Sequence, residues 1–238
     1  MRILLPPSEG KTPPESGHPL RLGDLSFPAL TAARSRVLQE LVRVSGRSDA
    51  AAILGVGERV MPEVRAQRRL AELPCAPARE IYTGVLYEAA RLHEGDDVLI
   101  FSGLFGVTTG DDLIPDYRLS MNVSLPDVGG LRSWWRRELA AAVRQEDSDV
   151  TVDMRSGAYR ITSPTGPWWD MRVVDGRGRV VTHMAKRYRG LLTRALLDAG
   201  VNRRIADDDV AQITRTLGRV EVACDGLRRH LTLTPDAG

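Results

Sequence analysis

Lysine is nearly absent from this sequence of 238 residues, although basic residues are common. All of the 33 Lys and Arg residues are arginine except Lys11 and Lys186. A planar guanidinium cannot replace a compact ammonium where the geometry of a site requires one. The two lysines that survive this preference for arginine therefore predict functional positions.

Long apolar runs are missing too. A transmembrane helix needs roughly 18 or more apolar residues, and the best candidate, residues 98–107, is interrupted by a serine and two glycines. The sequence begins without the apolar core of a signal peptide, because Pro6 and Pro7 follow only three apolar residues. With 42% hydrophobic and 27% charged residues, the composition predicts a soluble, cytoplasmic protein without membrane contact.

Cysteine and histidine are too few and too scattered for the common metal centres. Two cysteines exclude a disulfide scaffold and a four-thiolate zinc site. We expect both Cys75 and Cys224 to be buried as small apolar residues. The four histidines include no pair at the spacing of metal ligands, so neither a metal nor a cofactor is expected.

Basic residues concentrate toward the end of the sequence. Residues 1–150 hold 18 Lys or Arg against 21 Asp or Glu, whereas residues 151–238 hold 15 against 10. Between residues 176 and 197 there are six basic residues and no acidic one. This stretch is suited to a polyanion such as nucleic acid or a nucleotide. A solvated helix face would give the same pattern.

Helical and extended patterns alternate irregularly along the chain. Buried or alternating strands are predicted at residues 2–5, 98–101, 117–123 and 150–154, and hairpins at 171–174 with 180–183 and 220–224 with 230–233. Helices are predicted in pieces over 29–73 and at 78–92, 131–143 and 185–199. The order lacks the strict alternation of a doubly wound sheet. We therefore predict one α+β domain, residues 1–238, with a mixed β-sheet surrounded by helices.

The loop after the first predicted strand is a candidate anion site. Its Gly10-Lys11-Thr12 sequence is similar to the end of a phosphate-binding P-loop. A P-loop is nevertheless excluded, because Leu5 stands where the first glycine belongs and the following prolines prevent the required helix. Ser8, Lys11 and backbone N–H groups at a strand end can still bind an anion.

Two further segments combine glycine with candidate functional residues. In the predicted helix at 185–199, Lys186 and Gly190 lie on one basic face. A glycine inside a helix costs roughly 1 kcal/mol, so Gly190 predicts close approach of a partner such as a phosphate backbone; an incidental glycine is the alternative. Gly103 and Gly106 after a buried strand loosely resemble the turn of a helix-hairpin-helix DNA-binding module, although a purely structural turn is the better explanation.

Six motifs occur in the order known from one family. They are the opening Ile-Leu-Leu-Pro-Pro-Ser-Glu-Gly-Lys-Thr, then Tyr82-Thr83-Gly84, Ser102–Val107, Asp116–Met121, Ser156–Tyr159 and Ala185–Gly190. The chain resembles the YaaA peroxide-stress protein family over essentially its whole length. This resemblance implies a single α+β domain with a basic cleft, binding of double-stranded DNA partly through a helix-hairpin-helix-like element, and a role in limiting damage by hydrogen peroxide and free iron.

The motif positions and the basic helix together define the candidate residues for binding nucleic acid or another anion. These are Ser8, Lys11, Thr12, Tyr82, Thr83, Ser102, Gly103, Gly106, Tyr117, Arg118, Ser156, Tyr159, Lys186, Arg187, Arg189, Gly190 and Arg194.

Two functions remain open at this point. The leading hypothesis is a protein that binds the backbone of double-stranded DNA in a basic cleft. The alternative is an enzyme acting on a nucleotide or another small anion in a pocket lined by Lys and Arg. Under both, we expect Lys11 and Lys186 to share one site within about 10 Å, a Debye length at 0.1 M salt. A bound anion or a carboxylate from Glu9, Asp112 or Asp116 is expected between them.

Overall fold

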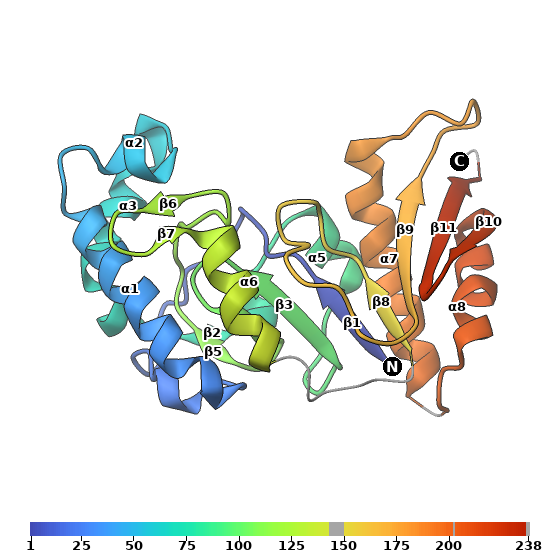
Figure 1. Ribbon diagram of the computed structural model, residues 1–238, viewed down its shortest axis with the longest axis horizontal. Coiled ribbons are helices and arrows are strands. Elements are labelled where there is room, and N and C mark those ends of the chain that lie inside the picture. Colours follow the sequence, from blue (N-terminus) through green and yellow to red (C-terminus); the bar gives the residue numbers. More distant parts are fainter. Residues whose placement is uncertain (143–149, 202, 237–238) are drawn as a thin grey trace.

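A seven-stranded mixed sheet forms the centre of the protein (Figure 1). The computed structural model describes residues 1–142, 150–201 and 203–236. The order of the strands across the sheet is β10-β11-β9-β8-β1-β3-β4. Their bounds are β1 (Arg2–Leu5), β3 (Val98–Ser102), β4 (Gly106–Thr109), β8 (Thr151–Asp153), β9 (Trp168–Val173), β10 (Gly218–Asp225) and β11 (Arg228–Pro235). Two small sheets pair β2 (Ala76–Pro77) with β5 (Leu113–Ile114) and β6 (Ser124–Leu125) with β7 (Gly129–Gly130).

Five central strands run parallel. β1 lies between β3 and β8, β8 pairs with β9, and β9 pairs with β11, all in parallel register. The two outer strands are antiparallel to their neighbours: β4 pairs with β3, and β10 pairs with β11. Parallel neighbours end at the same edge of a sheet, so the loops that follow β1, β3 and β8 are brought together there.

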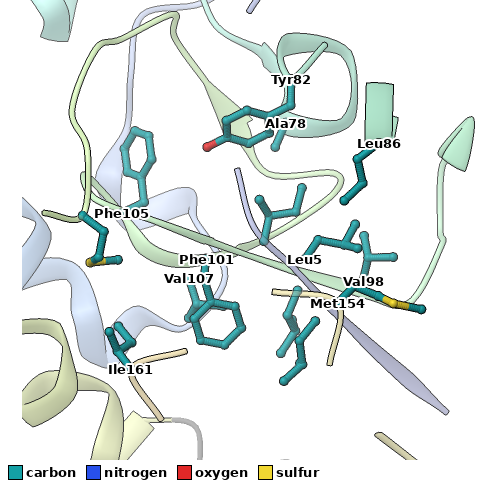
Figure 2. Close-up of a cluster of buried hydrophobic side chains, with 14 of the residues drawn as sticks. Leu5, Ala78, Tyr82, Leu86, Val98, Phe101, Phe105, Val107, Met154 and Ile161 are labelled. Carbon is teal, nitrogen blue, oxygen red and sulfur yellow. The ribbon is translucent and has the colours of Figure 1, made fainter. Parts of the chain in front are cut away.

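The central strands are buried, which explains their continuous apolar sequence. All five residues of β3 are buried, and Ile3 of β1 is in register with Val98. Strands covered on both faces lose the alternation of polar and apolar residues seen in half-exposed strands. Figure 2 shows the resulting cluster, in which Leu5, Phe101 and Val107 lie among aliphatic side chains from several segments.

Helices gather around both ends of the sheet. Figure 1 shows α1 (Thr31–Ser45), α2 (Ala50–Leu54) and α3 (Met61–Ala66) at one end, and α7 (Thr182–Gly200) and α8 (Asp207–Thr214) beside β9, β10 and β11 at the other. The remaining α-helices are α4 (Ala78–Ile81), α5 (Val85–Ala90) and α6 (Leu131–Ala142). Short 3-10 helices lie at Leu22–Asp24, Pro28–Leu30, Glu58–Val60, Gln67–Glu72 and Arg215–Leu217. Across the described residues, no helix combines the length and the apolar character needed to cross a membrane.

The predicted α+β class with a mixed sheet surrounded by helices is confirmed. The strands predicted at 2–5, 98–101 and 150–154, the closing hairpin and the long helix near the end of the chain are all present. The residues of the predicted helix 131–143 are helical as α6 up to Ala142, and residue 143 lies outside the described residues.

The helix predicted over 78–92 is wrong in one respect, because it is broken into α4 and α5. The break falls at Tyr82, which forms an isolated bridge with Lys11. The Thr12 N–H donates to the Ile81 carbonyl at 2.9 Å, and the Thr83 N–H donates to the Gly10 carbonyl at 3.0 Å. The backbone groups around Tyr82 thus pair with the loop after β1 in place of continuing the helix.

Three other predictions fail for reasons of tertiary structure. Residues 180–183 form no second hairpin strand, because β9 already has β8 and β11 as neighbours; a single bridge joins Val174 to Val180 before α7 begins. Residues 117–123 form a loop and no strand. Cys75 is buried as expected, but Cys224 is exposed, since β10 is the outermost strand of the sheet.

Candidate functional site

The loop that follows β1 carries Lys11 to the edge where the parallel strands end. Two prolines end the strand, and the backbone pairing with Tyr82 then fixes the position of Lys11. The Lys11 ammonium donates a hydrogen bond to the Ser8 carbonyl at 2.9 Å. A Cβ on Gly84, whose φ is +99°, would lie 3.2 Å from the Ser8 hydroxyl, so this segment packs closely against the loop.

Two tyrosine rings enclose the Lys11 side chain. Its Nζ lies 4.7 Å from the ring centre of Tyr117 and 5.6 Å from that of Tyr82. At such distances the faces of aromatic rings attract a cation. Both tyrosines are almost fully buried, and Figure 2 shows the Tyr82 hydroxyl pointing away from the apolar side chain of Leu86. The site is thus open to polar chemistry on one side and bounded by the hydrophobic core on the other.

A chain of hydroxyl groups lies next to the amine. The Tyr82 and Tyr117 hydroxyls are 2.7 Å apart, and the hydroxyl of Ser102, at the end of β3, lies close enough to both to act on their pKa values. Ser102 also accepts the Phe105 N–H at 3.1 Å, which fixes its position. Burial raises the pKa of both tyrosines well above its usual range, so that both stay protonated at neutral pH.

The amine itself is easier to deprotonate than that of an ordinary lysine. Burial lowers the pKa of Lys11 to about 8, against an opposing effect of Asp116 and with a further lowering by Arg118. Burial also raises the pKa of Asp116, and one of its carboxylate oxygens is buried without a hydrogen-bond partner among the described residues. Lys11 and Asp116 are therefore a half-buried amine and a half-buried acid that act on each other through space.

Arg118 is held at this site by its neighbours. Its guanidinium forms an ion pair with Glu63 and donates to the Glu9 carbonyl, while its backbone N–H donates to the Gln67 side chain. Glu9 and Asp116, two of the three carboxylates expected near Lys11, do act on its charge. The third, Asp112, bonds instead to Ser26 and to the backbone of Thr109, so its predicted place between the lysines is wrong.

The loop after β8 completes the group. The Tyr159 N–H donates to the Ser156 carbonyl at 2.9 Å, and the backbone of Met121 and the side chain of Ser120 act on the pKa of the Tyr159 hydroxyl. A fourth tyrosine, Tyr87, donates to the Pro6 carbonyl at 2.7 Å. Electrostatic interactions link Tyr87 and Tyr159 to the others. Four of the five tyrosines of the chain thus gather where β1, β3 and β8 end. Of these four, only Tyr87 was not predicted from the sequence to belong to the site.

Gly103 and Gly106 serve the turn between two strands. The segment joins β3 to β4, with Ser102 paired to Gly106, so here the expected helix-hairpin-helix geometry is absent and two strands stand in place of two helices. A Cβ on Gly103 would lie 2.7 Å from the Leu119 carbonyl, and one on Gly106, whose φ is +71°, 2.5 Å from the Trp135 ring. Both glycines are explained by internal packing, and the structure places no open space for a phosphate beside them.

Gly190 likewise packs against protein. It is buried, and an added Cβ would lie 2.2 Å from the Leu86 carbonyl of α5. The close approach predicted from this glycine exists, but the approaching group is a helix and no external phosphate backbone. Arg194 is also structural, since it forms an ion pair with Asp96 at 3.0 Å and donates to the Arg91 carbonyl.

Arg189 belongs to a second buried network that the sequence did not reveal. It donates to the Met171 carbonyl at 3.4 Å, and burial lowers its pKa. Asp153, at the end of β8, pairs with Arg155, and both are about 1% exposed. Asp170 of β9 accepts bonds from Arg160, Arg228 and His230. Four arginines of this network, Arg155, Arg160, Arg189 and Arg228, face two carboxylates, so the network carries an excess of positive charge, and its ion pairs hold the loop after β8 in place.

Lys186 and Arg187 remain exposed on α7. α5 and α7 run parallel, since Gly190 faces Leu86 and Arg194 contacts Arg91. Lys186 lies one helical turn, about 6 Å, before Gly190 on the same face. The start of α5, where Gly84 meets Ser8, is therefore the part of that helix next to the Lys186 end of α7. A shared site for the two lysines stays a prediction, with Lys11 at its base and Lys186 toward its rim. Thr12 is exposed and Thr83 half-buried in the same region.

Together the fold and this site define an α+β protein with a buried lysine, tyrosine and serine cluster at the carboxyl edge of a mixed sheet. The family model described as "Peroxide stress protein YaaA" matches residues 1–214. A UPF0246 protein of Streptomyces coelicolor is 40% identical over 218 residues, covering 84% of each chain. A UPF0246 protein of Corynebacterium efficiens is 36% identical over 249 residues, covering 98% of this chain and 99% of its own. The chain belongs to the YaaA peroxide-stress family.

Proposed function

We propose that the protein is an enzyme that acts on a small anionic molecule bound over Lys11. The carrying observation is the enclosed amine: Lys11 packs against the rings of Tyr82 and Tyr117, whose hydroxyls are hydrogen-bonded to each other. A cation placed only for structure is normally paired with a carboxylate, as Arg194 is with Asp96. Among the described contacts of Lys11, the hydrogen bond goes to a neutral carbonyl.

The groups around Lys11 are those of acid–base or nucleophilic catalysis. A buried amine close to another cation loses its proton more readily, and the neutral amine is a base and a nucleophile. The two tyrosine hydroxyls form a hydrogen-bonded pair along which a proton can move. Asp116 adds a carboxyl group whose pKa is raised by burial. Perturbed groups of this kind cluster at functional sites more often than elsewhere.

The negative charge of the substrate is favoured by the cations of the region. Lys11 and Arg118 lie inside the site, and Lys186 and Arg187 are exposed on the helix that borders it. Cations that line a partly enclosed site raise the local concentration of an anion. A phosphate or carboxylate group on the substrate is the part that these cations would hold.

Calorimetric titration with inorganic phosphate, nucleotides and sugar phosphates tests this proposal. The Lys11→Met variant should lose at least about tenfold in affinity for the best of these ligands. Such a loss corresponds to about 1.4 kcal/mol of binding free energy, which removal of one charged contact can account for. Arg219→Met is the matched control, since Arg219 is an exposed cation on β10. Equal affinity in the wild type and Lys11→Met would contradict the proposal.

A second candidate is binding of double-stranded DNA through its backbone, in support of a peroxide-stress and iron-homeostasis role. The favouring observation is the exposure of four cations in and near the basic stretch, namely Arg172, Arg177, Lys186 and Arg187. Gly190 and Arg194 no longer support it, because both pack within the protein. Backbone contacts make affinity depend steeply on salt.

A salt series of duplex binding tests this second function. Each true phosphate contact that is neutralised should lower the salt slope by about one unit. Lys186→Ala and Arg187→Ala are expected to do so, and Arg219→Ala, on the far strand β10, is not. An unchanged slope in both α7 variants would remove the DNA hypothesis and leave the enzyme hypothesis standing.

A further inference from the structure

We propose that Lys11 is a nucleophile that forms an imine with the carbonyl carbon of an aldehyde or ketone carrying a phosphate group. The proposal rests on the function proposed above and names the substrate class of the same site. Three features of the site support it: the position of the amine, the adjoining hydroxyl chain and the cations around them.

The amine is placed as a nucleophile requires. Its hydrogen bond to the Ser8 carbonyl and its contacts with two aromatic rings fix Nζ without a carboxylate in hydrogen-bond contact. An ammonium bonded to a carboxylate would hold its proton, whereas one facing rings and a neutral carbonyl releases it more easily. With a pKa of about 8, the fraction of free amine at pH 7 exceeds that of an ordinary lysine by about 300-fold.

The hydroxyl chain supplies what imine formation needs next. Formation passes through a carbinolamine, whose hydroxyl group has to be protonated before it can leave as water. Tyr117 and Tyr82 stay protonated at neutral pH and share a hydrogen bond of 2.7 Å. The Ser102 hydroxyl lies next to them at the end of β3. These hydroxyls are placed to donate that proton and to recover one afterwards.

The step balances without any further reactant. The lone pair of Lys11 Nζ attacks the carbonyl carbon, the π electrons of the C=O bond move to oxygen, and the oxygen takes a proton. The nitrogen then loses a proton to give the neutral carbinolamine. Its lone pair forms the C=N bond as the C–O bond breaks, the hydroxyl leaves as water with a proton from the hydroxyl chain, and the protonated imine returns one proton to that chain. One amine and one carbonyl give one imine and one water, and no atom is oxidised or reduced.

The phosphate follows from the charges at the site. Arg118 next to Lys11 and the exposed Lys186 on α7 favour a dianion close to the reacting carbon. Two sources share this chemistry. One is a free sugar phosphate in its open-chain aldehyde form, and the other is the open-chain deoxyribose aldehyde at an abasic position of duplex DNA, which is flanked by phosphates.

Reductive trapping tests the inference. The full-length protein is incubated in separate arms with glyceraldehyde 3-phosphate and with a duplex containing one abasic position, sodium borohydride is added, and the adduct is mapped by mass spectrometry. Hydride from the borohydride reduces the imine to a stable secondary amine. Because the chain has only two lysines, Lys186 is an internal control. We expect the adduct on Lys11, and the arm in which it forms identifies the source.

Matched variants separate chemistry from binding. Lys11→Arg keeps the positive charge but cannot form the imine, so the adduct should be lost by at least about 100-fold, while Arg219→Met on β10 should retain adduct formation at Lys11. Tyr117→Phe should slow trapping by about tenfold or more with unchanged phosphate affinity. The trapping rate should rise with pH through a midpoint of about 8.

The outcomes distinguish this inference from the function on which it rests. Phosphate binding that depends on Lys11, without an adduct in either arm, overturns the imine and leaves the anion-binding function in place. Loss of both overturns both. An adduct equally distributed between Lys11 and Lys186, or one whose rate rises only near pH 10, would also contradict a special role of Lys11. An adduct confined to Lys11 in the wild type supports the inference independently of how any variant folds.

Discussion

The loop after β1 and the helix α7 look alike in sequence and differ in the folded protein. Each contains one of the two lysines, a glycine and further polar residues. In the loop, the lysine is buried among tyrosines and hydroxyls. In α7, the glycine packs against α5 and Arg194 pairs with Asp96, so much of the basic face is turned inward.

This difference shows what a count of charges leaves out. A basic stretch predicts a polyanion surface only if its cations lack partners inside the protein. On α7, Lys186 and Arg187 remain exposed, and Arg189 and Arg194 lie in internal networks. In the loop, the surroundings of a single cation, Lys11, remove water and leave its proton weakly held.

The largest expected effect is on stability, because the Lys11 ammonium, which is removed from water, destabilises the folded protein. At pH 7, Lys11→Met should raise the free energy of unfolding by up to about 3 kcal/mol, because a shift of each pKa unit corresponds to about 1.4 kcal/mol. The pKa of Lys11 lies lower in the folded protein than in the unfolded chain, so between pH 8 and 10.5 the unfolded chain binds more protons and the wild type becomes more stable as the pH rises. The advantage of the variant should therefore shrink by about 2 kcal/mol between pH 7 and 9.5.

Urea unfolding of Lys11→Met and Lys186→Met at both pH values measures this difference. Lys186 is exposed, so its replacement should change the stability by less than about 0.5 kcal/mol. A destabilised Lys11→Met, or a difference that does not depend on pH, would mean that the amine is a structural cation like Arg194.

Replacement of the packing glycine of α7 is the next test by size. Gly190→Ala should destabilise the protein by about 2 kcal/mol, because the new Cβ would lie 2.2 Å from the Leu86 carbonyl. Gly57→Ala is the control, since a Cβ there meets nothing within 4 Å. If Gly190→Ala leaves the free energy of unfolding unchanged and weakens only DNA binding, Gly190 faces a ligand. The difference drawn between α7 and the loop after β1 would then be wrong.

A smaller effect is expected for the ion pair that holds α7 to the loop before β3. The side chains of Arg194 and Asp96 are 14% and 12% exposed, so Arg194→Met should cost about 1–2 kcal/mol, between the values for exposed and buried pairs. Thermal unfolding measures this loss of stability. Arg179→Met is the exposed counterpart, because Arg179 pairs with Asp175 and its side chain is 71% exposed. Equal losses in the two variants would place Arg194 among ordinary surface cations.

The smallest expected effect concerns the hydroxyl pair. Tyr117→Phe removes one partner of a buried bond of 2.7 Å and should cost about 1 kcal/mol. Urea unfolding at pH 7 measures the loss, and Tyr188→Phe on α7 is the control outside this cluster. A stability gain in Tyr117→Phe would show that the hydroxyl chain is not satisfied as described.

Local patterns predicted the elements whose partners are close in sequence or uniformly apolar. The continuous run of β3, the amphipathic helix α7 and the β10–β11 hairpin are of this kind. The split between α4 and α5 was not predictable locally, because it depends on pairing between Tyr82 and Lys11, which are 71 positions apart. The absent strand at 180–183 has the same cause, since the neighbours of β9 come from distant segments.

The site was predictable in outline. Parallel strands bring their carboxyl ends together, and that rule places Lys11, Ser102 and Tyr159 near one another as expected. The packing of two tyrosine rings around Lys11 and the contact of Tyr87 with the loop after β1 depend on tertiary structure. No local sequence pattern indicates them. The prediction of a ligand at Gly190 was wrong. A glycine that allows close approach to a helix looks the same in sequence whether the approaching group is a ligand or another helix, here α5.

Lysine NMR tests the central claim most directly. Protein labelled with carbon-13 at the lysine ε position gives two lysine signals, since the chain has two lysines, and Lys11→Arg assigns them. The account predicts that the Lys11 signal titrates with a midpoint of about 8. A midpoint near 10.5, the value of a lysine in water, would contradict the buried amine and the functions built on it.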